Sequence, residues 1–300
     1  MRYGVCILPE YPWRQAEPIW RRAEELGFDH AWTYDHLVWA GLPDAPWHST
    51  VATLTAAAMV TERIRLGTLV ASPNFRHPVT FMRDAVTLDD ISSGRLLLGM
   101  GTGADRDAEI LGEELTRGQR TRRFAEFVEL LDALLRGDHV DYTGDFFTAA
   151  DARNQPGPTQ LPRTPFVIAA NGPRAMALAA RYGQGWLTTG PLSGPVGRTA
   201  AQGDAESLAQ WWEGLAQTVD RFDAIEAAAR QSSDVASTAL DRYLSLDACG
   251  VMALSSADFF AEQSKRAADL GFTDVVVHWP RASPPYEADL AVLDQIDLRA

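Results

Sequence analysis

Asp35 and His36 are the two residues of this chain best suited to acid–base chemistry. They follow a short apolar and aromatic run, residues 31–34, that has the length of a β-strand. A histidine gains or loses a proton near neutral pH, and an adjacent carboxylate can orient and tune its ring. Because the pair stands where a strand ends, we predict that it belongs to a catalytic site. The alternative is a capping aspartate beside a surface histidine.

A glycine-rich segment at residues 99–103 follows another predicted strand. It superficially matches a dinucleotide-binding loop, but that loop should open a helix at once and be followed by an acid at the end of the next strand. Neither feature is visible in the sequence. The glycines therefore indicate a flat ligand that lies close to the backbone.

A third candidate segment begins at Asn171, where Asn-Gly-Pro-Arg follows a predicted strand and opens a helix. Free backbone N–H groups and the helix dipole could hold a phosphate there, and Thr189 and Gly190 after the next strand could face it. The alternative is ordinary loop chemistry, because proline is common at a first helical position.

Strands and helices alternate along most of the chain, which favours a parallel sheet. The count of units comes close to eight. We therefore predict one (β/α)8 TIM barrel over residues 1–300, with a hairpin insertion at about 138–150 and a variable excursion at about 191–206. Its reactive groups should come from the loops after the strands. A doubly wound sheet is the alternative.

Composition narrows the partners and the compartment. The net charge of −13 disfavours nucleic acids and anionic membranes. Cys6 and Cys249 lie far apart in apolar surroundings, which predicts a reducing, cytoplasmic setting. No apolar segment approaches the roughly 20 residues of a membrane helix, and no motif indicates a metal site.

Several motifs together resemble the bacterial-luciferase-like oxidoreductases. They are Gly-Phe-Asp-His-Ala-Trp-Thr-Tyr-Asp-His from Gly27, Arg-His-Pro from Arg76, Ser-Gly-Arg from Ser93, Leu-Gly-Met-Gly-Thr-Gly from Leu98, and Ala-Ala-Asn-Gly-Pro from Ala169. Their order and spacing agree with the family from the N-terminus to about Gly190. The Asp-His pair resembles the branch that uses coenzyme F420, an 8-hydroxy-deazaflavin, in place of FMN.

This resemblance implies a (β/α)8 barrel with the deazaflavin ring in its mouth. The residue matching Asp35 would contact the deazaflavin, and the one matching His36 would transfer the proton beside the hydride position. Leu69 and Val70 stand where the family has a non-proline cis peptide bond behind the ring. Ring and ribityl contacts would fall on Ser72, Thr102 and Gly103, and the phosphate end on Asn171, Gly172, Arg174 and Thr189, with Gly190 next to it.

The chain also departs from the sugar-phosphate dehydrogenases of this branch. Ala104 stands where they have a catalytic glutamate, and about Leu192 where they have a substrate-phosphate lysine. Both differences argue against a phosphorylated sugar. Asp105, Asp107 or Glu109 could replace the glutamate only if the loop bends differently.

Three tryptophans on predicted loop ends, Trp39, Trp47 and Trp279, would give the pocket aromatic walls. Core packing is the alternative for each of them. The remaining histidines are expected to be structural or to lie on the surface: His30, His48, His77, His139 and His278.

We therefore expect an F420-dependent reductase or dehydrogenase acting on a small, largely apolar organic molecule, with His36 as proton donor or acceptor. One alternative is an FMN-dependent monooxygenase of the same fold. Another is a degenerate barrel that binds its cofactor without turnover. The resemblance also implies a homodimer.

Overall fold

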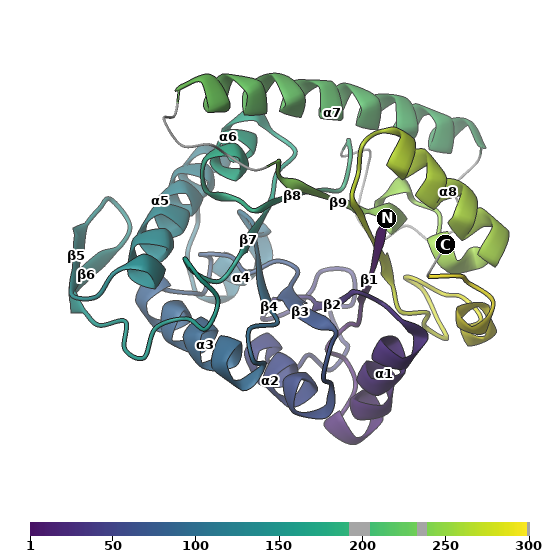
Figure 1. Ribbon diagram of the computed structural model, residues 1–300, viewed down its shortest axis with the longest axis horizontal. Coiled ribbons are helices and arrows are strands. Elements are labelled where there is room, and N and C mark those ends of the chain that lie inside the picture. Colours follow the sequence, from purple (N-terminus) through teal and green to yellow (C-terminus); the bar gives the residue numbers. More distant parts are fainter. Residues whose placement is uncertain (192–204, 233–238, 299–300) are drawn as a thin grey trace.

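Eight parallel strands close into a barrel in this computed structural model, which describes residues 1–191, 205–232 and 239–298 (Figure 1). Around the barrel the order is β1-β10-β9-β8-β7-β4-β3-β2, and β1 pairs with β2 to close it. The predicted (β/α)8 barrel is therefore confirmed. The strands are β1 Arg2–Cys6, β2 His30–Thr33, β3 Arg65–Thr68, β4 Leu96–Met100, β7 Phe166–Ala169, β8 Gly185–Thr188, β9 Asp241–Ser245 and β10 Asp274–His278.

Helices cover the outside of the barrel (Figure 1). Local sequence explains where they start and stop: Thr116 and Gln119 form a reciprocal capping box at the start of α5, and Gly27 ends α1 in the left-handed conformation with φ of 98°. Each helix buries one apolar face against the strands. The helices are α1 Trp13–Leu26, α2 Thr50–Val60, α3 Pro78–Ile91, α5 Arg117–Arg136, α6 Pro173–Tyr182, α7 Ala205–Ser232 and α8 Ala257–Asp269.

The predicted insertions and ends differ in detail from the observed ones. A hairpin of β5 Val140–Thr143 and β6 Thr148–Ala152 lies between α5 and β7, near the predicted insertion. The expected excursion at about 191–206 falls largely on residues 192–204, outside the described residues.

Two further predictions about helices are wrong. No helix was expected directly after the glycine-rich segment, but a short one, α4 Asp105–Ile110, follows it. The last helix, expected over residues 286–296, is reduced to the 3-10 turn η4 Leu290–Asp294. Tyr286 has a φ of 67°, a left-handed conformation that an α-helix cannot contain.

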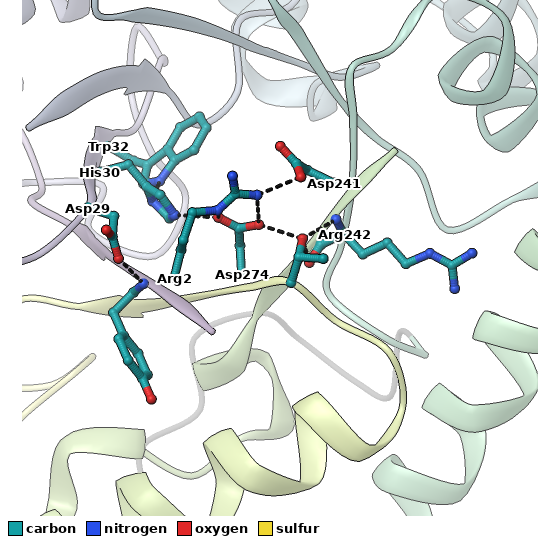
Figure 2. Close-up of polar contacts among 9 residues, drawn as sticks. Arg2, Asp29, His30, Trp32, Asp241, Arg242 and Asp274 are labelled. Atoms are coloured by element: carbon teal, nitrogen blue, oxygen red, sulfur yellow. Dashed lines mark hydrogen bonds and ion pairs between the residues drawn. The ribbon is translucent and has the colours of Figure 1, made fainter. Parts of the chain in front are cut away.

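Polar side chains form a closed network at the floor of the barrel, where the strands begin (Figure 2). Trp32 Nε1 donates to His30 Nδ1 at 2.6 Å, and His30 Nε2 lies 3.0 Å from Asp274 Oδ1. Arg2 donates to both oxygens of Asp274 at 2.8 and 2.6 Å, and also reaches Asp241 at 2.6 Å. The buried carboxylate of Asp274 is thus satisfied from several strands, as a buried charge requires.

No helix in the described part of the chain is both long enough and apolar enough to span a membrane.

Candidate functional site

His36 is held by a carboxylate at the open end of the barrel. Its Nδ1 lies 2.7 Å from Asp107 Oδ2, and the backbone N–H of Leu37 donates to Asp107 Oδ1 at 2.8 Å. The side chain of Asp107 is fully buried, whereas that of His36 is 16% exposed. Because an ionised carboxylate only accepts hydrogen bonds, Nδ1 carries the proton and Nε2 is left for a ligand.

The bend that brings Asp107 to His36 follows from the glycine-rich segment. Gly103 has a φ of 68°, and a Cβ there would lie 2.5 Å from the side chains of Ser72 and Asn74. α4 then starts directly after Ala104 and places Asp107 on its buried side. Of the three acidic residues considered as replacements for the glutamate, it is Asp107 that contacts His36. Its replacement of the glutamate stays a prediction.

Asp35 is buried and paired with an arginine that the sequence analysis assigned no role. Arg76 Nε donates to Asp35 Oδ2 at 2.5 Å, and its Nη2 donates to Oδ1 at 2.7 Å. Burial of Arg76 opposes its charge, but the hydrogen bonds and charge of Asp35 outweigh this and raise the pKa of the guanidinium. The signal available in the sequence was the Arg-His-Pro motif that starts at Arg76.

The peptide bond between Leu69 and Val70 is cis, at the position where the resemblance places one. A Cβ at Gly101 would lie 2.7 Å from Val70 Cγ2, so only glycine lets the two loops approach this closely. The two loops therefore form adjoining parts of the barrel mouth.

The start of α6 meets the end of β8 through side-chain hydrogen bonds. Asn171 Nδ2 donates to Thr189 Oγ1 at 2.7 Å, and Thr188 Oγ1 donates to Asn171 Oδ1 at 2.6 Å. Gly190 N donates in turn to Thr188 Oγ1 at 3.0 Å. The facing of these two segments, expected from the sequence, is confirmed.

The first turn of α6 is open. Gly172 makes no side-chain cap, and a Cβ added to it would meet nothing within 4 Å. Arg174 lies in this turn and is exposed. The free N–H groups of a first helical turn are suited to an anion.

Two of the three predicted tryptophans belong to one aromatic wall. Trp39 and Trp47 lie 6.0 Å apart by ring centroids, and Trp47 lies 6.4 Å from His36. Tyr286, which the sequence analysis missed, stacks on Trp39 at 6.1 Å with ring planes 8° apart. Trp279 is also buried and follows β10 at the same end of the barrel, where its backbone N–H donates to Cys6 O at 2.9 Å, but it makes no ring contact with the pair among the described residues. Its place in the pocket wall stays a prediction.

The fold and these groups define a class: a (β/α)8 barrel with a histidine–carboxylate pair, a cis peptide bond and an open helix start at the carboxyl ends of its strands. Residues 1–247 match the family described as luciferase-like monooxygenase. The chain belongs to this family.

Named relatives in this family include dehydrogenases and a monooxygenase. The chain is 31% identical over 283 residues to an F420-dependent glucose-6-phosphate dehydrogenase of Amycolatopsis mediterranei, covering 92% of this chain and 83% of that one. It is 31% identical over 261 residues to 4-hydroxyprotoasukamycin monooxygenase of Streptomyces nodosus subsp. asukaensis, covering 80% and 66%. Against two further F420-dependent glucose-6-phosphate dehydrogenases the match covers 50% of each relative's length.

Among solved structures, the fold is similar to an F420-dependent secondary alcohol dehydrogenase in complex with an F420-acetone adduct. The TM-score is 0.76 at 18% sequence identity, covering 99% of this chain and 98% of that one. At this identity the likeness shows the shared barrel.

Proposed function

We propose that this protein is a coenzyme F420-dependent oxidoreductase that moves a hydride between the deazaflavin and a small, largely apolar organic substrate. A relative whose match covers most of both chains is named as an F420-dependent dehydrogenase. His36 exchanges the proton that accompanies the hydride. Asp35 and Arg76 act as one charged pair toward the cofactor.

The observation that carries this proposal is the hydrogen bond from His36 to Asp107. Since Asp107 fixes the proton on Nδ1, the lone pair of Nε2 is available to take a proton from a substrate, and the same nitrogen can return it. The buried carboxylate also stabilises the imidazolium that results. This arrangement is that of an oriented base, and it argues against a degenerate barrel without turnover.

The residues at the barrel mouth fit the two ends of the proposed cofactor. The first turn of α6, at Gly172 and Arg174, is an open anion site for the phosphate. Asn74 Oδ1, beside Gly103, is buried without a hydrogen-bond partner in the described part of the chain, as expected for an acceptor that a ligand satisfies. When bound, the deazaflavin supplies the hydride chemistry, while the protein binds, orients and excludes water.

The substrate is inferred to be uncharged because the arginines around the mouth other than Arg174, which is assigned to the cofactor phosphate, already have carboxylate partners. Arg76 is paired with Asp35, Arg120 lies 2.7 Å from Asp105, and Arg281 lies 2.6 Å from Glu10. An anionic substrate would have to compete with these carboxylates. Ala104 removes one further polar side chain from the loop, and Trp39 and Trp47 offer apolar surface. The position of Leu192 lies outside the described residues.

The test is a binding titration of purified protein with oxidised F420 and with FMN, followed by cofactor fluorescence. We expect the dissociation constant for F420 to be at least about tenfold lower than that for FMN. Thr189→Val, which removes the acceptor of Asn171, should weaken F420, and exposed Thr87→Val on α3 is its control. Tighter binding of FMN would contradict the proposal.

An FMN-dependent monooxygenase is the second candidate. It is favoured by the family description and by the monooxygenase of Streptomyces nodosus subsp. asukaensis. A flavin activates dioxygen and a deazaflavin does not, so substrate-dependent oxygen uptake with reduced FMN would identify it. A homodimer in the cytoplasm stays a prediction for either candidate.

A further inference from the structure

Trp211 and Trp212 are adjacent residues of α7, but their indole N–H groups differ in how they are satisfied. Trp212 Nε1 donates to Gln263 Oε1 on α8 at 2.8 Å. Trp211 is only 2% exposed, and its Nε1 is buried without a hydrogen-bond partner in the described part of the chain. A buried donor without an acceptor destabilises the folded protein, so this N–H calls for an acceptor that a ligand could bring.

The N–H side of the Trp211 ring faces the loop after β8. A Cβ added to Gly190 would lie 2.8 Å from Cε2 of Trp211 and 2.9 Å from both Cζ2 and Nε1. These three atoms form the edge of the indole that carries the N–H. Gly190 also has a φ of 72°, so glycine is what allows the loop and this edge to approach so closely.

A second glycine holds the same loop against α7. Gly214 lies inside the helix, one turn after Trp211, and a Cβ there would lie 2.8 Å from Pro191 Cγ. Glycine is unfavourable inside a helix, but here it makes room for Pro191. Because residues three apart lie on one face of a helix, Gly190 and Pro191 both rest on the face of α7 that carries Trp211.

This contact places the Trp211 N–H beside the open start of α6. Thr189, the residue before Gly190, accepts from Asn171, and Asn171 directly precedes Gly172, the N-cap of α6. α6 and α7 pack beside each other on the outside of the barrel (Figure 1). The first turn of α6 has backbone N–H groups without intrahelical acceptors, and Trp211 adds a side-chain N–H from a second helix. Donors from two helices indicate a ligand with several acceptor oxygens.

We propose that Trp211 is a further phosphate-binding residue, whose indole N–H donates to an oxygen of the phosphate on the cofactor's side chain. The inference rests on the proposed function, which assigns the phosphate of F420 to the first turn of α6. A phosphate has enough acceptor oxygens to bind both helices at once, and hydrogen bonds to its charged oxygens are strong. Trp211 therefore makes the site prefer a phosphate-bearing cofactor over its phosphate-free form.

The test compares oxidised F420 with the ribityl-deazaflavin that ends in a hydroxyl group where F420 carries its phosphate. Fluorescence titration of purified protein gives the two dissociation constants, and their ratio measures the preference for the phosphate-bearing form. Trp211→Phe removes the N–H and keeps an aromatic ring. It should lower this preference by roughly 10- to 100-fold, the range for a hydrogen bond to a charged group, by weakening F420 alone.

Two other tryptophans serve as matched controls. Trp212→Phe removes an N–H that is already paired, so it should keep the wild-type preference and lower the melting temperature, because Gln263 loses its donor. Trp20 lies on α1, and its buried Nε1 also lacks a partner among the described residues. Trp20→Phe should keep the wild-type preference as well. An equal loss of preference in Trp20→Phe and Trp211→Phe would overturn the inference.

A measurement on the wild-type protein decides the question if Trp211→Phe does not fold. With ¹⁵N-labelled tryptophan, the nine tryptophans of the chain give indole N–H signals in an NMR spectrum. One indole proton should move downfield in the F420 complex relative to the complex with the phosphate-free form, because a new hydrogen bond deshields it. Identical indole signals in the two complexes would overturn the inference.

Failure of this inference can be told apart from failure of the proposed function. If F420 binds and folded Trp211→Phe keeps the wild-type preference, the inference is overturned and the proposed function stands. If FMN binds in place of F420, the proposed function fails, and the same ratio measured with riboflavin and FMN decides the inference. Binding of neither phosphate-bearing cofactor overturns both.

Discussion

The floor and the mouth of the barrel each contain a histidine bonded to a buried aspartate, yet the two pairs are built differently. At the floor, both nitrogens of His30 have partners, Trp32 and Asp274, and its side chain is 2% exposed. At the mouth, Nδ1 is the only nitrogen of His36 with a hydrogen-bond partner among the described residues, and the side chain is 16% exposed. The same pair of residue types is therefore closed at the floor, where it stabilises the fold, and leaves one nitrogen available to a ligand at the mouth.

The strongest way to break this comparison is to remove the open imidazole. His36→Ala should lower turnover by roughly 10²- to 10⁴-fold, the range for loss of a general acid or base, and leave F420 affinity nearly unchanged. Turnover would be followed by deazaflavin absorbance with the best substrate from a panel of small alcohols and ketones.

His30→Ala is the reciprocal control for this experiment. It should lower the melting temperature while the folded fraction keeps its turnover. Undiminished turnover in His36→Ala would remove the proposed role of this residue.

At the floor, the largest expected effect is on stability. Asp274→Ala leaves the buried Nε2–H of His30 without its acceptor, whereas Arg2 keeps Asp241, and an unsatisfied buried donor destabilises by about 1–3 kcal/mol. Urea unfolding measures this change. Asp107→Ala should lower the free energy of unfolding by less than Asp274→Ala, because its partner His36 is more exposed than His30. A larger decrease in the free energy of unfolding for Asp107→Ala than for Asp274→Ala would contradict the comparison.

Acid should destabilise the floor of the barrel by protonating Asp274. Burial opposes its charge, but hydrogen bonds from His30 and Arg2 outweigh this and lower the pKa of Asp274 below its ordinary value of 3.8. A carboxyl with a lowered folded-state pKa binds protons more readily when unfolded, so its stabilisation is complete above about pH 4 and is lost as the pH falls below that value.

Asp274→Asn should therefore be less stable than the wild type at pH 7, and the difference should shrink from about pH 4 downward. Unfolding by urea across this pH range measures it, with exposed Asp44→Asn as the control. A difference that stays constant with pH would refute the assignment to this carboxyl.

The parts of the molecule that follow from local sequence were predictable. The periodicity of apolar residues indicated the strands and most helices, and Gly27 and the Asn-Gly-Pro segment marked helix boundaries that the structure has. Asp35 and His36 stood out because they follow a strand closely; the strand ends at Thr33, one residue before Asp35. Alternation of strands and helices predicted a parallel sheet, and the count of units close to eight favoured the barrel over a doubly wound sheet.

The partners of those residues were not predictable, because closure of the barrel brings them together. Asp107 lies 71 residues from His36, and Arg76 lies 41 residues from Asp35. The hydrogen bond between the hydroxyls of Tyr34 and Tyr286 joins residues 252 positions apart. No local pattern distinguishes Asp107 from Asp105 until α4 forms and turns one of them toward the core. Tyr286 was assigned to a helix because its left-handed backbone has no signal in its side-chain type.

The smallest expected effect comes from a matched pair of hydroxyl deletions. Thr273 donates to Asp274 Oδ2 at 2.6 Å at the floor, and Thr189 accepts from Asn171 at 2.7 Å at the mouth. Thr273→Val should lower the free energy of unfolding by about 0.5–1.5 kcal/mol, the net value of one hydrogen bond, without changing F420 affinity. Thr189→Val should instead raise the dissociation constant for F420 by roughly 2- to 10-fold with a smaller change in stability. Urea unfolding and the cofactor titration, applied to both variants, separate the two effects. If both substitutions changed stability alone, the mouth would be as purely structural as the floor, and the distinction between the open and the closed pair would lose its functional meaning.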